Sequence, residues 1–167
     1  WFPGGNDNWY ITQYIVEGMG RLRQLRAGKA TVPTAEEMLG EAIAYIDARL
    51  LEGYEKLQRE AAAGRADLEA DHLHGLAAHY LYARSFFPGQ PRQAAAEEAY
   101  QYYLGQAARF WLDRNLYQQG VIALALHRAG REAEAQRIVR SLRERALQSE
   151  ELGMYWNYER GWFWYQL

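Results

Sequence analysis

Apolar side chains recur three or four residues apart in six successive stretches of this chain, which is the spacing of one face of an α-helix. Glycine and proline residues separate the stretches and indicate short connectors. No stretch alternates apolar and polar residues cleanly enough to require a sheet. We therefore predict an all-α fold of about three antiparallel helical hairpins, with a first helix ending near Leu25 and others at residues 33–60, 68 or 71–86, 93–113, 116–128 and 132–148.

Local signals refine the first two helices and the end of the chain. Asn6, Asp7 and Asn8 crowd the start of the first helix, where a side-chain oxygen can accept a hydrogen bond from a free backbone amide. Thr34 and Glu37 have the spacing of a capping box, which predicts the start of the second helix. The residues after 151 are predicted to form a loop or a short aromatic hairpin. The predicted core face of the first helix consists of Ile11, Ile15, Gly18, Leu22 and Leu25.

Length and composition exclude several classes of protein. The 167 residues suit one domain with one core. A formal net charge of −2 gives no basic face for nucleic acid, and no run of about eighteen apolar residues predicts a membrane span. The absence of cysteine removes disulfides and thiol chemistry from these residues. Because the chain starts at Trp1 and stops in an aromatic run, we expect it to be a piece of a longer polypeptide.

Three histidines invite a test for a metal site. A zinc site needs at least three ligands that converge on one point. His72 and His74 would point to different faces of a helix, while His72 and His79 lie two turns apart with no evident third partner. We therefore predict no metal site and no cofactor.

Three carboxylates near aromatic stretches are the candidates for acid/base hydrolysis. They are Asp71, Glu159 and Glu17, and they belong to no recognisable acid motif. A glycosidase would need two such groups in one cleft. We predict that these side chains are solvated on helix surfaces and that the chain has no catalytic residue.

Aromatic residues gather at both ends of the chain. Large rings fill gaps between helix ends, and we favour that structural role over a ligand site. We expect the rings from the two ends to meet. The residues predicted to form this packing or partner face are Trp1, Trp9, Trp156, Tyr158, Trp162 and Trp164.

Four segments, in order, resemble bacterial α2-macroglobulin-like proteins. They are WYITQYI (9–15) after a WFPGG loop, HYLYARSFF (79–87), the run 119–130 that ends in LALHRAG, and YW (155–156) with RGWFWY (160–165). The match is to the helical thioester-type domain, a complement-like α/α toroid, of the large secreted forms of Bacteroidetes type. Nearly the whole chain takes part in the resemblance.

The resemblance implies a role that composition alone does not. The family's toroid has six helical hairpins, so this chain would be its central portion, and the cysteine and glutamine of the thioester would lie upstream. The implied role is a non-catalytic scaffold in endopeptidase inhibition by entrapment, in a periplasmic, outer-membrane-associated or secreted protein. The implied partners are a target endopeptidase, bound through the parent protein, and neighbouring domains. Because an isolated piece of a toroid exposes apolar helix faces, we expect it to form homodimers.

Two other functions remain open from the sequence. Toroids of this type also house carbohydrate- and lipid-processing enzymes, which would place two carboxylates in one aromatic-walled cavity. Residues 124–142 resemble the turn of a tetratricopeptide-like repeat, which would make the chain a protein-interaction module. No fixed period runs through all three predicted hairpins, which disfavours the repeat.

Overall fold

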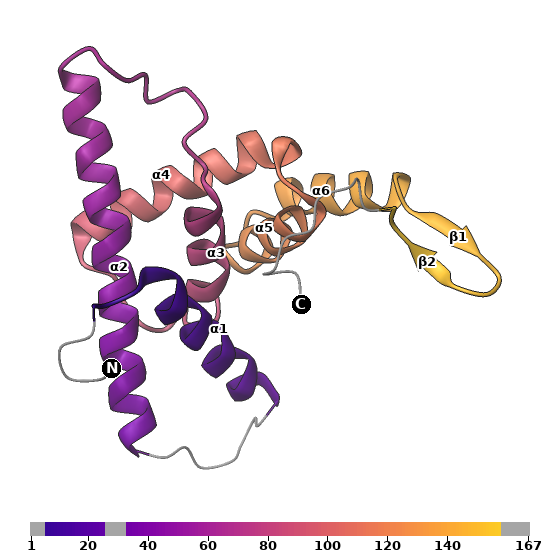
Figure 1. Ribbon diagram of the computed structural model, residues 1–167, viewed down its shortest axis with the longest axis horizontal. Helices are drawn as coiled ribbons and strands as arrows, with labels where there is room; N and C mark the ends of the chain where they lie inside the picture. Colours follow the sequence, from indigo (N-terminus) through magenta and orange to yellow (C-terminus); the bar gives the residue numbers. More distant parts are fainter. Residues whose placement is uncertain (1–5, 26–32, 158–167) are drawn as a thin grey trace.

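In the computed structural model of this protein, residues 6–25 and 33–157 are described, and they form six α-helices, a 3-10 turn and one hairpin (Figure 1). The all-α prediction is confirmed. None of the helices within these ranges combines the length and the hydrophobicity needed to cross a membrane. The elements are α1 (Trp9–Leu25), α2 (Pro33–Ala62), α3 (Gly75–Arg84), α4 (Ala94–Phe110), η1 (Trp111–Asp113), α5 (Leu116–Arg128), α6 (Glu132–Glu144), β1 (Leu147–Ser149) and β2 (Gly153–Tyr155).

Consecutive helices pack in pairs, α1 with α2, α3 with α4 and α5 with α6, and α4 also packs on α2. Near the end of α1, Arg23 pairs with Glu36 in the first turn of α2. The ring of His74, just ahead of α3, meets Tyr103 in the second half of α4. Across the third pair, the residue that follows α6 is hydrogen-bonded to the first turns of α5.

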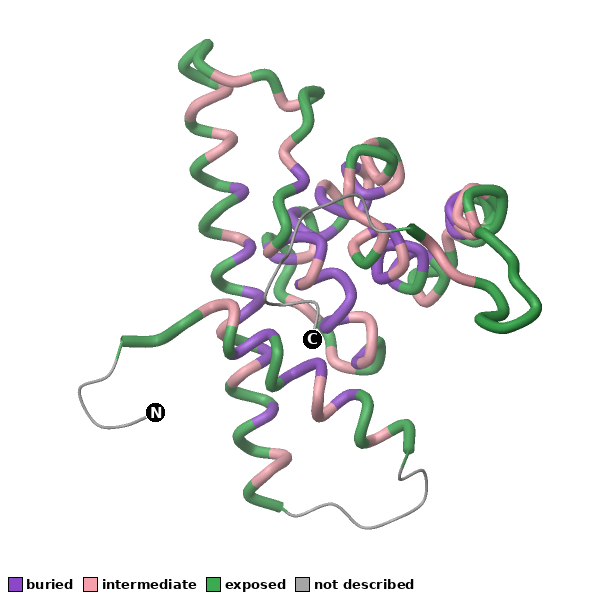
Figure 2. The backbone as a smooth tube through the Cα atoms, turned by 45° about the vertical axis from the view of Figure 1, so that its right-hand side comes forward, coloured by how far each residue is buried: buried purple, intermediate pink, exposed green. Residues whose placement is uncertain are grey.

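The first helices of the three pairs lie side by side in the order α1, α3, α5, with α3 in the centre (Figure 1). Helices α3 and α5 run in the same direction. At their starts, Gln118 Nε2 lies 3.0 Å from the position that a Cβ of Gly75 would take. At their ends, Arg128 Nη1 donates to Ser85 Oγ at 3.0 Å. Figure 2 shows the buried residues collected along α3 and the helix faces around it.

A buried ion pair ties α3 to α2 and to the start of the connector that leads into α4. Arg84 is 1% exposed and donates from Nε to Asp47 Oδ1 at 3.0 Å. Its two other nitrogens donate to the carbonyls of Phe87 and Gln90, each at 2.7 Å. The Tyr80 hydroxyl donates to the same carboxylate at 2.5 Å, and burial together with the Asp47 charge holds the pKa of Tyr80 well above its ordinary value. Every part of the guanidinium therefore has a partner, which a buried charge requires.

The predicted core face of α1 is wrong. Ile11, Ile15 and Leu22 are about half exposed, and Leu25 is 83% exposed. Ile11 and Ile15 instead line a hollow of about 680 Å³ between α1 and α2. The buried side of α1 is largely polar or small. Glu17 pairs with His79 of α3, Thr12 Oγ1 donates to the Asn8 carbonyl, and Gly20 lies against Phe86, which are contacts that hydrophobicity does not reveal. The buried residues are Thr12, Gln13, Val16, Glu17 and Gly20.

Several predicted helix ends also shift. Helix α2 begins at Pro33, so Thr34 lies inside its first turn and the predicted capping box is wrong. Helix α3 starts only at Gly75, because residues 71–74 before it are irregular and Gln106 Oε1 accepts a hydrogen bond from the His72 amide there. Helix α6 ends at Glu144, four residues before its predicted end, and a hairpin of Leu147–Ser149 with Gly153–Tyr155 follows it, with Gly153 at φ +69°. This hairpin begins before residue 151, after which a loop or a short aromatic hairpin is predicted, and residues 158–167 of that stretch lie outside the described residues. The α/α toroid stays a prediction. The predicted contact between the aromatic rings of the two chain ends stays one as well, since Trp1, Trp162 and Trp164 lie outside the described residues.

The contact between α1 and α3 predicts opposite effects of two alanine substitutions. A Cβ at Gly20 would lie 2.5 Å from Phe86 Cβ and Cγ, whereas a Cβ at Gly18 has no atom within 4 Å. We expect Gly18→Ala to stabilise the fold by about 0.5–1 kcal/mol through helix propensity. Gly20→Ala should destabilise it by about 1–3 kcal/mol because of the overlap. Urea unfolding followed by circular dichroism measures both, and equal stabilisation by the two changes would show that α1 does not approach Phe86 so closely.

The buried ion pair predicts a large loss of stability when one partner is removed. Asp47→Ala would leave Arg84 as an uncompensated buried charge, and we expect a loss of about 3–5 kcal/mol in the free energy of unfolding. The control is Arg49→Ala on the same helix, because Arg49 pairs with Glu52 on the exposed side. It should cost under about 1 kcal/mol in the same urea titration. Losses of similar size would contradict the assignment of Asp47 as the partner of a sealed charge.

Candidate functional site

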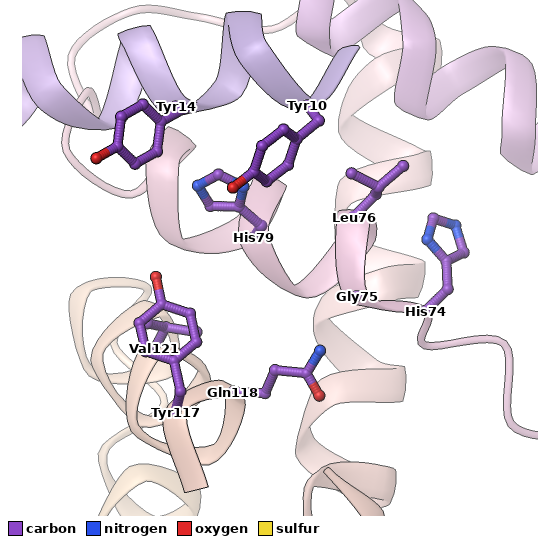
Figure 3. Close-up of a pocket in the computed structure, with 9 residues that line it drawn as sticks. All are labelled: Tyr10, Tyr14, His74, Gly75, Leu76, His79, Tyr117, Gln118 and Val121. Atoms are coloured by element: carbon purple, nitrogen blue, oxygen red, sulfur yellow. The ribbon is translucent and has the colours of Figure 1, made fainter. Parts of the chain in front are cut away.

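A cavity of about 440 Å³ lies where α1, α3 and α5 meet (Figure 3). Each helix contributes one side of it. The lining is mainly aromatic and apolar, with a few polar groups, which is the usual character of a ligand pocket. The residues are Tyr10 and Tyr14 from α1, His74, Gly75, Leu76 and His79 at the start of α3, and Tyr117, Gln118 and Val121 from α5.

A buried carboxylate behind the cavity wall fixes His79. Glu17 Oε2 lies 2.7 Å from His79 Nε2, and Glu17 Oε1 lies 2.7 Å from Arg21 Nη2 one helical turn further along α1. Burial by itself would raise the pKa of Glu17, but the hydrogen bond from His79 and the charges of His79 and Arg21 outweigh it, so the pKa is lowered. Both oxygens of the carboxylate are therefore engaged in holding α1 against α3.

Aromatic rings frame His79 at the cavity mouth. The Tyr10 ring is tilted against the His79 ring at a centroid distance of 5.9 Å and is stacked on Tyr14 at 6.5 Å. From α5, the Tyr117 hydroxyl points across the cavity toward α1 (Figure 3). Burial, with the negative charge of Glu17 nearby, raises the pKa of Tyr117 to about 12. The hydroxyl of Tyr117 therefore keeps its proton at neutral pH and is available as a hydrogen-bond donor or acceptor.

At the opposite end of the cavity, His74 closes the start of α3. Its Nδ1 accepts a hydrogen bond from the Ala77 amide at 3.2 Å, so the side chain is the N-cap of this helix. Burial lowers the pKa of His74, which favours the neutral ring that can accept this bond. Trp9 packs edge-on against His74 with ring centroids 5.9 Å apart. The cap and the ring contact thus anchor α1 to the first turn of α3.

The three histidines weighed as metal ligands lie in three separate settings. His72 Nε2 lies 2.8 Å from the carbonyl of Asp67, His74 caps α3, and His79 is paired with Glu17. Within residues 6–25 and 33–157, no three histidine or carboxylate side chains are grouped so that they could hold a metal ion.

The three candidate acids are not brought together either. Asp71 pairs with Arg114 at the connector ahead of α3, and Glu17 lies behind His79. Glu159 lies outside the described residues. Among the described residues, no Asp or Glu lines the cavity, so two carboxylates do not face one another there.

Two of the six predicted aromatic residues can be placed. Trp9 is half-buried against the core beside His74. Trp156 is half-buried after β2, and its Nε1 donates to the carbonyl of Leu142 in α6 at 2.7 Å. These two rings contact different elements. The other four, Trp1, Tyr158, Trp162 and Trp164, lie outside the described residues.

Sequence reasoning missed the residues that form the cavity wall on α1 and α5. Tyr10 and Tyr14 are one helical turn apart, as are Tyr117 and Val121. This four-residue spacing marks a shared helix face and was a usable signal. The isoleucines at positions 11 and 15 give a more hydrophobic pattern on the neighbouring face of α1, which is why that face was predicted to be buried.

Comparison with known proteins adds no relative. No protein-family profile, no curated protein and no solved structure matches this chain.

The engaged carboxylate predicts a pH-dependent contribution to stability. Because the pKa of Glu17 is lowered in the fold, its contribution is present above the ordinary value of 4.5 and is lost as the pH falls through the lower folded value. At pH 7 we expect Glu17→Gln to cost about 1–3 kcal/mol, since it weakens charged hydrogen bonds to His79 and Arg21.

The difference between wild type and Glu17→Gln should shrink in urea titrations below pH 4.5. Glu52→Gln, on the exposed side of α2, is the control and should track the wild type across the same range. A constant gap between Glu17→Gln and the wild type from pH 7 to the acid limit would rule out the charged pairing.

Proposed function

We propose that residues 1–167 are a scaffold portion of an α/α toroid in an α2-macroglobulin-like inhibitor of endopeptidases and carry no catalytic residue of their own. The observation that supports this most strongly is the side-by-side order of α1, α3 and α5. An α/α toroid is built from successive helical hairpins whose first helices form one layer, and the contacts of α3 with both α1 and α5 support the proposal of such a layer.

Three of the four segments that carry the resemblance fall in that layer. Residues 9–15 lie in α1, residues 79–87 run through α3 and just beyond it, and residues 119–130 lie in and just after α5. Direct contacts join them, namely the Tyr10–His79 ring pair and the hydrogen bond from Arg128 Nη1 to Ser85 Oγ at 3.0 Å. Segments more than a hundred residues apart in the chain thus belong to one packed unit, which favours a common origin for these three matches over unrelated ones.

The state of the polar groups supports a scaffold role. One carboxylate oxygen of Glu17 pairs with Arg21 on α1 and the other with His79 on α3. A ring nitrogen of His72 contacts the Asp67 carbonyl, and a ring nitrogen of His74 caps α3, so these side chains have structural contacts. The alternative of an acid/base hydrolase needs two carboxylates that share a cavity, and the described lining supplies none.

In the proposed role, a protease cuts a bait region elsewhere in the parent protein, which then changes shape around the protease. The helical unit would move as a rigid body, because Arg84 holds α2, α3 and the following connector in one arrangement. The proposal includes an endopeptidase as the target, contacts with neighbouring domains, and a periplasmic, outer-membrane-associated or secreted location.

The test uses the natural polypeptide that contains residues 1–167, mixed with an equimolar amount of trypsin. We expect one preferred cleavage outside residues 1–167 and a faster-migrating species on a native gel. The trapped trypsin should still hydrolyse a small peptide substrate while losing activity against a large protein substrate. Trypsin blocked at its active-site serine is the control and should produce no shift. Parallel activity against both substrates, or no change in migration, would overturn the proposed role.

A further inference from the structure

We propose that the β1–β2 hairpin is an arm that binds a second copy of this chain, with the hairpin of each copy lying along α6 of the other. The hairpin extends beyond the end of α6, away from the other helices (Figure 1). All three residues of β1 and the first two of β2 are exposed (Figure 2). An isolated two-stranded hairpin is barely stable in water, so a segment with this exposure gains stability from a partner surface.

Apolar side chains are exposed on both faces of the hairpin and at its turn. Leu152 in the turn is 67% exposed, Met154 is 50% exposed and Leu147 is 41% exposed. Leu147 pairs with Tyr155 and Gln148 pairs with Met154. Because side chains alternate along a strand, Leu147 and Met154 point to opposite faces. Such exposed apolar groups are typical of a surface that binds a partner.

The base and the turn of the hairpin are both held by hydrogen bonds. Trp156 Nε1 donates to the carbonyl of Leu142 at 2.7 Å, which fixes the base of the hairpin to the last turns of α6. In the turn, the Leu152 amide donates to Ser149 Oγ at 2.8 Å. An arm that is ordered before it binds loses less conformational entropy on binding.

The tip of the hairpin and the outer face of α6 carry opposite charges. Glu150 and Glu151 lie in the turn, and both are exposed. Arg137 and Arg140 are also exposed, and their three-residue spacing places them on the same side of α6, away from its buried residues. Arg143 flanks them one turn further along. The chain therefore carries both members of a complementary pair of surfaces.

These charges are not neutralised within one copy. Among the described residues, none of these five side chains takes part in an ion pair. Residues 137–143 contain three arginines and no acid, since the glutamates of α6 lie in its first turn and at position 144. Bringing the acidic tip of a second copy onto this stretch relieves the repulsion between neighbouring arginines.

The lengths of the hairpin and of α6 allow both contacts to form at once. A strand rises about 3.3 Å per residue, so Glu151 lies about 13 Å beyond Leu147. A helix rises about 1.5 Å per residue, so Arg140 and Arg137 lie about 10 and 15 Å before Leu147. A two-fold axis at the junction of α6 and the hairpin therefore brings each acidic tip beside Arg137 and Arg140 of the other copy. This match of distances favours a second copy over an unrelated partner.

The expected dimer is weak. The two arms overlap over about 25–30 Å and about one helix width of 10–12 Å, which belongs to the small class of interfaces. We expect a Kd of about 10–100 µM at low salt. The contact does not depend on the proposed role of the parent protein.

Sedimentation equilibrium of the 167-residue chain from about 10 µM to 1 mM measures the association. We expect the mass to rise with concentration from 19.4 kDa toward twice that value. The double variant Glu150→Arg with Glu151→Arg should weaken association at least about tenfold, and so should Arg137→Glu with Arg140→Glu, because each places like charges together twice in the dimer. An equimolar mixture of the two double variants should restore association, because both contacts then pair opposite charges again.

The matched control exchanges the charges of an exposed ion pair on α2, with Glu55→Arg and Arg59→Glu together. It should associate as the wild type does, and far-UV circular dichroism checks that all variants keep their helices. The wild type also gives a test without substitution, since raising sodium chloride from 50 to 500 mM should weaken association about three- to tenfold.

Three results would overturn the proposal. A wild type that stays at 19.4 kDa up to 1 mM would show that the arm does not bind a second copy. Association that neither salt nor the charge reversals change would place the interface elsewhere, such as the hollow between α1 and α2. A mixture of the two double variants that fails to associate would contradict the pairing of the hairpin tip with α6.

Discussion

The structure depends on one buried charge. Arg84 is removed from water at the end of the central helix, and such a charge is tolerated only when partners replace its hydration. Asp47 from α2 supplies the countercharge, and two carbonyls beyond α3 accept from the remaining nitrogens. These bonds are directional, so they fix where α3 lies along α2 and where the chain turns toward α4. Hydrophobic burial drives the helices together, but the guanidinium selects one arrangement.

The other helices then pack on a fixed α3. Along one side, α1 approaches closely at Gly20 and is held through Glu17 and His79. On the other side, Arg128 at the end of α5 donates to Ser85 and lies over the Phe86 ring, 4.0 Å from its centroid. Toward the starts of the three helices the space between them is lined by tyrosine and histidine rings. The cavity is thus a consequence of how three neighbouring helices are anchored around α3.

The sequence predicted the elements better than their faces. Helix α5 has the predicted bounds, because Asn115 caps its start and Gly130, at φ +77°, follows its end. Both are local signals. The buried face of α1 could not be read in the same way, since Glu17 is buried only because His79, 62 residues later, lies opposite. The buried face of α1 is determined by contacts with residues far away in the sequence, whereas the hydrophobicity pattern of α1 alone predicts that Ile11 and Ile15 are buried.

The role of Arg84 could not be predicted from the sequence either, because its partners are Asp47 on α2 and two backbone carbonyls, which no side-chain pattern encodes.

The most direct measurement is the exchange rate of the Arg84 Nε proton, followed by ¹⁵N-resolved NMR in the intact chain. If the guanidinium is sealed between Asp47, Phe87 and Gln90, this proton will exchange as slowly as the backbone amides of α3, while that of the exposed Arg109 exchanges quickly. Equally fast exchange at Arg84 and Arg109 would contradict the buried charge on which the arrangement of the helices rests.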